Sequence, residues 1–122
     1  MKSLILMLFL VLGNVSFAQS ISGEVSIKGT APKGVLYIFA KKFGGKMPMP
    51  LAVKKIVAPK FPLKFELSQK DAMMKEIPFK GPFVVTARLS PSGDASDKSG
   101  LEVSTIEKVS IGQENIQLIL AK

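Results

Sequence analysis

Two methionines, each followed by a proline, are the residues of this chain best suited to metal chemistry. Thioether sulfur selects Cu(I), so Met47 and Met49 are candidate soft ligands. A Cu(I) site gathers about three or four such ligands, and Met73 and Met74 complete a set only if the fold brings them near. The prolines in Met47-Pro-Met-Pro50 also favour an extended backbone and withhold ladder donors, which is typical of the start of a β-strand. We favour the strand start and predict no metal ligand; a carrier of Cu(I) or of a small ligand is the alternative.

Residues suited to catalysis are scarce. The chain contains neither histidine nor cysteine, which removes the commonest general base, the commonest sulfur nucleophile and the usual ligands of zinc, haem and iron–sulfur clusters. Ser68 and Lys70 stand too close in the sequence to converge on one turn. Asp94, Asp97 and Glu102 lack the calcium-loop spacing and are expected to be solvated loop acids. We predict no enzyme activity and no cofactor.

The N-terminal residues have the plan of a secretory signal peptide. Lys2 gives a short basic start, residues 4–12 are an unbroken apolar run, and residues 16–18 form a small-x-small cleavage site. The run is shorter than the roughly 20 apolar residues that a transmembrane helix needs. We predict a signal peptide over residues 1–18, cleaved after Ala18, and export to the periplasm; a retained N-terminal anchor is the alternative.

The remaining residues, 19–122, match the length of one domain, and we predict a single domain there. Since the chain has no cysteine, this exported domain must be held by packing and not by disulfides.

Charge favours an acidic or anionic partner. The formal net charge is +8, and outside the cytoplasm this favours an acidic protein or an anionic membrane surface over nucleic acid. The alternative is a merely solvated basic face. The basic residues concentrate between Lys41 and Lys64. The candidate contact residues from this region are Lys41, Lys42, Lys54 and Lys55.

Arg88 is the only arginine, and it lies in an otherwise apolar strand on the face shared with Val84, Thr86 and Ser90. It either pairs with a neighbouring acid or makes a bidentate contact to the carboxylate of a partner. Arg88 is therefore a further candidate contact residue, together with Met47, Met49 and Pro50.

Alternation of apolar and polar side chains runs through most of the chain, which indicates β-strands. Residues 35–40 are apolar on both faces and predict a central strand. Pro59 and Pro62 indicate that the strand expected at 63–67 starts late or lies at an edge. Ser68 and Asp71 resemble a capping box and predict a helical turn through residues 72–74. The expected strands are 21–28, 35–40, 51–58, 63–67, 83–90, 103–111 and 115–120.

About seven short strands separated by turn signals predict an all-β fold, an antiparallel β-sandwich of the immunoglobulin-like kind with one short helical turn. A tight turn at residues 112–115 is expected to join the last two strands. The large side chains expected in the core are Phe39, Phe65, Val85 and Leu118.

Several segments, taken in order, resemble the C-terminal periplasmic domain of the CycH/CcmI-type cytochrome c-biogenesis proteins. The most specific are Pro-Met-Pro-Leu-Ala-Val at 48–53 and Ala-Arg-Leu-Ser-Pro-Ser-Gly at 87–93. The other segments are 34–40, 61–67, 71–73 and 99–101.

The resemblance implies a non-catalytic binding module that serves cytochrome c maturation, either by handling apocytochrome c or by helping to assemble the haem-ligation complex. Family members usually carry transmembrane helices and helical repeats before this domain, whereas a signal peptide is expected here. The repeats are the part expected to grip the apocytochrome tail, so that activity is not carried over. Met49, Pro50, Leu51 and Arg88 match positions of the family pattern.

The two interpretations of the methionine–proline stretch differ in a direct measurement. If the stretch is the start of a strand, titration of the purified protein with Cu(I) will show no stoichiometric binding. One equivalent of tightly bound Cu(I) would favour the carrier, because thioether ligands bind this ion and few others.

Overall fold

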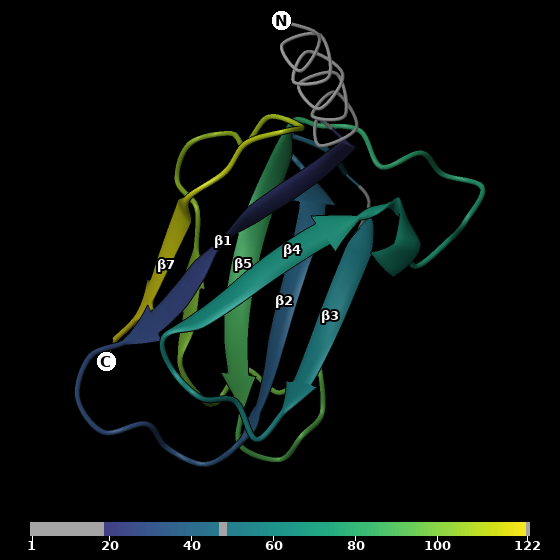
Figure 1. Cartoon of the computed structure of the whole chain (residues 1–122). Coiled ribbons are helices and arrows are strands. Elements are labelled where there is room, and N and C mark those ends of the chain that lie inside the picture. The colour runs from purple at the N-terminus through teal and green to yellow at the C-terminus, as the bar shows by residue number, and fades with distance from the viewer. Residues whose placement is uncertain (1–18, 47–48, 122) are drawn as a thin grey trace, which may run out of the picture.

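A computed structural model describes residues 19–46 and 49–121, which form two facing β-sheets (Figure 1). Within those ranges, no helix is long and apolar enough to cross a membrane. The predicted signal peptide over residues 1–18 lies outside the described residues. The elements are β1 (Ser20–Ile27), β2 (Val35–Lys42), β3 (Ala52–Val57), β4 (Leu63–Ser68), the 3-10 turn η2 (Gln69–Asp71), β5 (Phe83–Ser90), β6 (Glu102–Ser104) and β7 (Ile116–Leu120).

One sheet has the strand order β4-β1-β7 and the other has β3-β2-β5-β6. The all-β sandwich that the sequence predicted is confirmed. β2 is a central strand, as its two apolar faces indicated, and it lies between β3 and β5. β4 begins directly after Pro62 and lies at a sheet edge. A proline there removes no hydrogen bond from the sheet through its missing N–H.

One strand pair departs from the expected antiparallel arrangement. β7 runs parallel to β1, with Gly23 opposite Ile116 and Ile27 opposite Leu120, whereas the other described pairs are antiparallel. A side chain at Gly23 would collide with the backbone of Ile116. Glycine at this position therefore allows the two backbones to meet where the parallel pairing begins.

The core lies between the sheets and is filled by alternate side chains of both. Phe65, Val85 and Leu118 belong to it, as predicted. Phe83 is fully buried there and stacks on Phe79 with 4.5 Å between ring centroids. Phe39 is buried too, but it lies on the opposite face of its sheet, because residues of β2 alternate and Ile38 points inward.

The outer face of the larger sheet is also covered. Tyr37 and Phe39 of β2 are each 7% exposed, and Thr86, Arg88 and Ser90 of β5 are similarly buried. Because these side chains alternate with the core residues, they must be buried on the outer face of the sheet.

The expected helical segment begins after Ser68 as predicted but does not extend through 72–74. It is a single 3-10 turn, Gln69–Asp71, and the Ser68 N–H donates to Asp71 Oδ2 at 3.0 Å, in keeping with the predicted capping pair. The chain then becomes extended at Ala72, which bridges to Ala52, and the Met73 N–H donates to the Leu51 carbonyl at 2.9 Å. These bonds to the start of β3 prevent a further helical turn.

The expected strand over 103–111 is wrong in length. β6 ends at Ser104, because the Thr105 hydroxyl takes the place of a backbone acceptor for the Val85 N–H at 3.1 Å. Val109 then makes an isolated bridge to Phe83.

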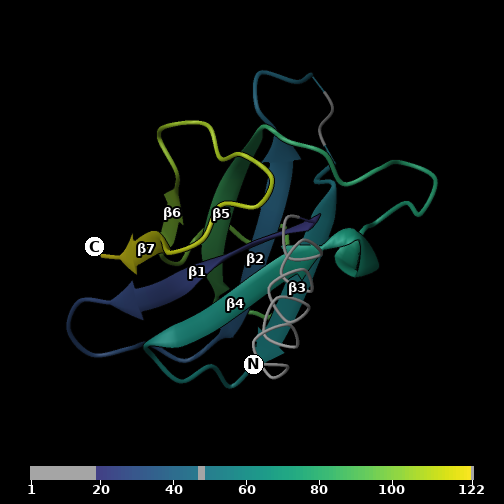
Figure 2. The same cartoon turned by 45° about the horizontal axis from the view of Figure 1, so that its top comes forward.

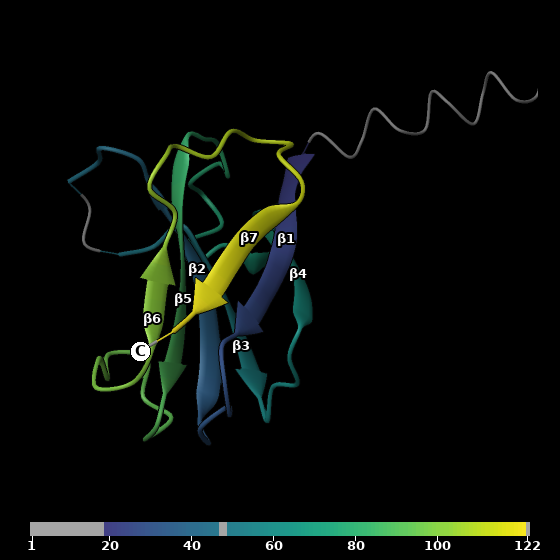
Figure 3. The same cartoon turned by 90° about the vertical axis from the view of Figure 1, so that its left-hand side faces the viewer.

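The last two strands do not form a hairpin, since β6 and β7 belong to different sheets. Figures 2 and 3 show the connection crossing the end of the sandwich from β6 to β7.

Truncation of a core phenylalanine tests this packing. Phe65→Ala should lower the free energy of unfolding by about 3–5 kcal/mol, because it leaves a cavity between the sheets. Phe43→Ala is the matched control: Phe43 is 40% exposed against 5% for Phe65, so its loss should cost no more than about 0.5 kcal/mol. Urea denaturation measures both values. Equal losses would show that Phe65 does not fill the core.

Candidate functional site

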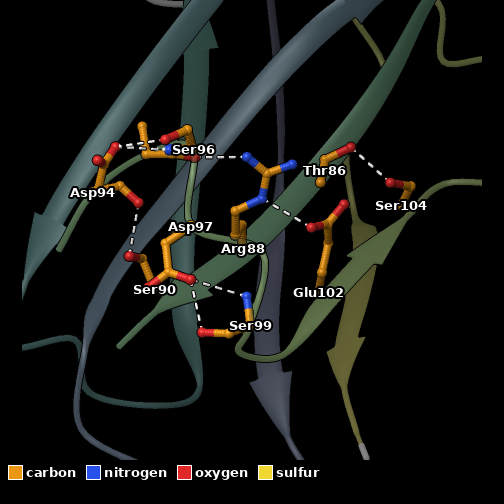
Figure 4. A network of polar contacts seen from close by, with 10 residues as sticks. Thr86, Arg88, Ser90, Asp94, Ser96, Asp97, Ser99, Glu102 and Ser104 are labelled. Atoms are coloured by element: carbon orange, nitrogen blue, oxygen red, sulfur yellow. Dashed lines mark hydrogen bonds and ion pairs between the residues drawn. The ribbon is translucent and has the colours of Figure 1, made fainter. Parts of the chain in front are cut away.

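The 91–101 loop folds back over the outer face of β5 and is held by three side chains of the sheet. The carbonyl oxygens of the successive loop residues 93–95 are the acceptors. The Tyr37 hydroxyl donates to the first at 2.6 Å, the Ser90 hydroxyl to the second at 2.7 Å and Arg88 Nη1 to the third at 2.6 Å. Figure 4 shows the part of this network around Ser90 and Arg88 from close by. The loop is thereby fixed to the sheet through its main chain.

Arg88 occupies the centre of the network and is only 9% exposed. Its Nε donates to Glu102 Oε1 at 2.8 Å across the β5–β6 pair, and its guanidinium carbon lies 5.0 Å from the ring centroid of Phe39. The pairing with a neighbouring acid, one of the two expected roles, is therefore present. Carboxylate, carbonyl and aromatic ring together offset the cost of burying this cation.

One nitrogen of Arg88 is not used within the protein. Nη2 makes no hydrogen bond with any described residue. No buried side-chain nitrogen or oxygen in the described ranges lacks a partner, so Nη2 must reach solvent.

The loop carboxylates order the loop instead of standing free in solvent. Asp94 Oδ1 accepts from the Ser96 N–H at 3.0 Å and from its hydroxyl at 2.9 Å, and these bonds lower the pKa of Asp94. The Ser99 hydroxyl donates to Asp97 Oδ1 at 2.7 Å, and bonds from Ser99 and Ser92 lower the pKa of Asp97. Both acids are thus held ionised as acceptors for loop donors.

Between the loop and the first residues of β3 lies a cleft of about 390 Å³ on the outer face of the larger sheet. Its floor is apolar and formed by Tyr37, Phe39 and Val53. Loop residues form one wall, and Pro50 and Met73 form the other. We call it the outer-face cleft; it is lined by Tyr37, Phe39, Lys41, Pro50, Val53, Met73, Arg88, Ala95, Ser96 and Lys98.

The charged residues that line the outer-face cleft are all cations: Lys41, Arg88 and Lys98. Lys41 Nζ lies 5.9 Å from the Phe39 ring centroid, a cation–π distance. Neither lysine has an ion pair or hydrogen bond with a described residue. The cleft therefore combines an aromatic floor with two lysine ammonium groups that have no acceptor among the described residues.

Exposed methionines border the cleft. Met73 lines it, while Met49 and Met74 line a smaller depression on the other side of Pro50. Their exposed fractions are 42% for Met49, 50% for Met73 and 43% for Met74. The fold thus brings Met73 and Met74 to the start of β3, which the sequence left open. Met47 lies outside the described residues.

Acidic side chains do not gather into a metal site in the described ranges. Nowhere in 19–46 or 49–121 do three His, Cys, Asp or Glu residues converge in a way that could hold an ion.

The candidate contact residues separate into two groups. Lys41, Pro50 and Arg88 line the outer-face cleft and Met49 lies beside it. The other three lysines do not line it. Lys42 donates to the Gly81 carbonyl at 3.3 Å, and Lys54 donates to the Glu66 carbonyl at 2.9 Å and lies 3.7 Å from Asp71 Oδ1. Lys55 is exposed on the edge strand β3, directly opposite Tyr37 and on the same face as Val53.

Sequence reasoning proposed only three of the ten lining residues as contact residues, namely Lys41, Pro50 and Arg88. It missed the other seven: Tyr37, Phe39, Val53, Met73, Ala95, Ser96 and Lys98. A signal was present in residues 35–40, which are apolar on both faces. Such a strand needs a cover on its second face, and the polar loop after Ser90 provides it.

The sequence and fold match known proteins. The family model described as the cytochrome c-type biogenesis protein H Ig-like domain matches residues 13–121. The chain is 32% identical over 107 residues to the cytochrome c-type biogenesis protein CycH of Pseudomonas aeruginosa, covering 86% of this chain and 24% of that protein. It is 26% identical over 94 residues to an uncharacterized protein of Aquifex aeolicus, covering 77% of this chain and 62% of that protein. The chain thus spans about a quarter of the length of the Pseudomonas protein and about three fifths of the length of the Aquifex protein.

Among solved structures, an alternative pilotin from the type II secretion system of Vibrio cholerae is similar, with a TM-score of 0.54 and 17% identity over 84% of this chain and 95% of that one. At this identity the likeness concerns the fold alone.

The loop carboxylates predict an acid-dependent loss of stability. Because their pKa values are lowered in the folded protein, their contribution is fully present above the ordinary carboxyl pKa of about 3.9 and disappears as the pH falls below it. The urea midpoint of the wild type should therefore fall from about pH 4 downward. The Asp94→Asn/Asp97→Asn variant should show a flatter profile. Parallel profiles for the two proteins would contradict this role.

Proposed function

This chain belongs to the cytochrome c-type biogenesis protein H Ig-like domain family, and from that premise we propose that it is a non-catalytic protein-binding module for cytochrome c maturation. Membership implies a role in cytochrome c biogenesis. The finer role that we propose is the handling of apocytochrome c or the assembly of the haem-ligation complex.

The outer-face cleft is the observation that supports binding. Protein-binding surfaces combine an apolar centre with polar groups at the rim, and they are enriched in aromatic residues, methionine and arginine. The cleft has this composition: Tyr37 and Phe39 form its floor, Met73 forms part of a wall, and Arg88 and Lys41 supply charge. Flexible methionine side chains also suit a surface that must fit a polypeptide.

We further propose that residues 1–18 direct export to the periplasm and that residues 19–122 act there as a single domain. Without Lys2 of the leader the formal net charge is +7, from 16 Lys+Arg and 9 Asp+Glu, and in that compartment this charge favours acidic protein partners. Contact with an anionic membrane surface is a secondary role of the same charge.

Capture from the native organism tests the function. The full chain with a C-terminal affinity tag should recover a cytochrome c-biogenesis component or apocytochrome c from a periplasm-containing extract, as identified by mass spectrometry. Retention should fall as salt rises, because screening shortens the Debye length from about 10 Å at 0.1 M to about 3 Å at 1 M.

Two double variants provide the control. Lys41→Glu/Lys98→Glu reverses charge in the cleft and should abolish capture, whereas Lys33→Glu/Lys60→Glu changes exposed lysines outside it and should leave most of it. Recovery of no maturation component by the wild type would reject the proposed function. Equal loss in both variants would reject the cleft as the contact surface.

A further inference from the structure

We propose that the outer-face cleft recognises a segment of the partner polypeptide in which a carboxylate lies beside a large apolar side chain. This inference rests on the proposed function, since it specifies the chemistry of the partner at the same site.

The floor of the cleft requires the apolar half of this segment. Tyr37 and Phe39 lie side by side on the outer face of β2, and Val53 is directly opposite Phe39 on β3. Tyr37 uses its hydroxyl on the loop carbonyl of Gly93, which leaves its ring as an apolar surface. Tyr37 and Phe39 are each only 7% exposed, so most of the apolar surface that a side chain placed here removes from water belongs to the more exposed Pro50, Val53 and Met73.

The walls require the anionic half. Three donors at the cleft have no acceptor among the described residues: Arg88 Nη2, Lys41 Nζ and Lys98 Nζ. A carboxylate accepts from a guanidinium or ammonium group through charge-assisted hydrogen bonds, which are stronger than neutral ones. A ligand carboxylate therefore supplies what these donors lack.

The acids near the cleft do not fill this role. Glu102 is paired with Arg88 Nε on the β6 side, and it does not line the cleft. Asp94 and Asp97 accept from serine donors of the loop. They reduce the net charge of the region, but neither lines the cleft or forms an ion pair with a described cation.

Size and surroundings favour a polypeptide over a free small acid. The volume of about 390 Å³ is near the lower end of ligand pockets, roughly 300–1,000 Å³, and suits one or two side chains. Met49 and Met74 extend the apolar surface past Pro50. A chain that continues over Pro50 covers this surface, whereas a small acid in the cleft leaves it exposed.

Matched peptides test both halves of the segment by NMR titration of the isotope-labelled full chain. The probe is acetyl-Ala-Leu-Asp-Leu-Ala-amide. Its controls are the Asn isostere, the peptide with both leucines replaced by alanine, and free 4-methylpentanoate. The probe should shift the backbone amides of Tyr37, Phe39, Lys41, Ala95 and Ser96. Each control should bind about tenfold more weakly, which corresponds to the loss of one strong contact.

Protein variants separate the cleft from general charge attraction. Lys41→Gln/Lys98→Gln should weaken binding of the aspartate probe and leave binding of the Asn peptide unchanged. Lys33→Gln/Lys60→Gln removes the same number of charges outside the cleft, and this variant should bind the probe as tightly as the wild type does.

The remaining outcomes are decisive as well. No shift at the cleft, equal binding of the Asp and Asn peptides, or equal weakening in both variants would overturn the proposal. Binding of 4-methylpentanoate as tight as that of the probe would overturn a polypeptide ligand. Peptide recognition without capture of a maturation component would reject the proposed function alone, whereas such capture with a negative titration would reject this inference alone.

Discussion

Three donors fixed on a sheet and three successive carbonyl oxygens of one loop determine the shape of the outer-face cleft. Tyr37, Arg88 and Ser90 stand on rigid central strands, so the loop can satisfy them in only one position. The requirement is strict because a buried guanidinium without partners is costly. The same contacts hold the loop above the sheet and so create one wall of the cleft. The geometry of the cleft therefore follows from the need to satisfy a buried arginine.

The fold was largely predictable because its strands alternate clearly. β2 and β5 lie where the pattern indicated. The parallel pairing of β1 with β7 was not predictable, since it depends on which edges meet after the sheets pack. The early end of β6 was missed for a different reason. The Thr105 hydroxyl accepts the Val85 N–H in place of a backbone carbonyl. The alternation of apolar and polar residues does not predict a hydrogen bond of this kind.

The site was less predictable than the fold. Arg88 was recognisable as a single charge in an apolar strand. Lys41 was proposed as a contact residue for its charge and Pro50 for its place in the methionine–proline stretch, and both line the cleft. Lys54 shows the limit of that reasoning, because it is engaged with Glu66 and Asp71 at the sandwich edge. Tyr37 and Phe39 looked like core residues. Their role depends on the loop that covers the second face of β2, and that contact spans many residues of sequence.

The loop is attached through its carbonyl oxygens, and every amino acid carries this group. The Ala95 side chain can therefore be exchanged during evolution without loss of this anchor, whereas Asp94 and Ser96 also order the loop through their side chains. Lys98 is exposed on the same segment and is equally replaceable. One wall of the cleft can consequently diverge quickly while the scaffold stays constant. Paralogues built on this plan would differ in the side chains that line this wall of the cleft and still share one set of anchoring residues.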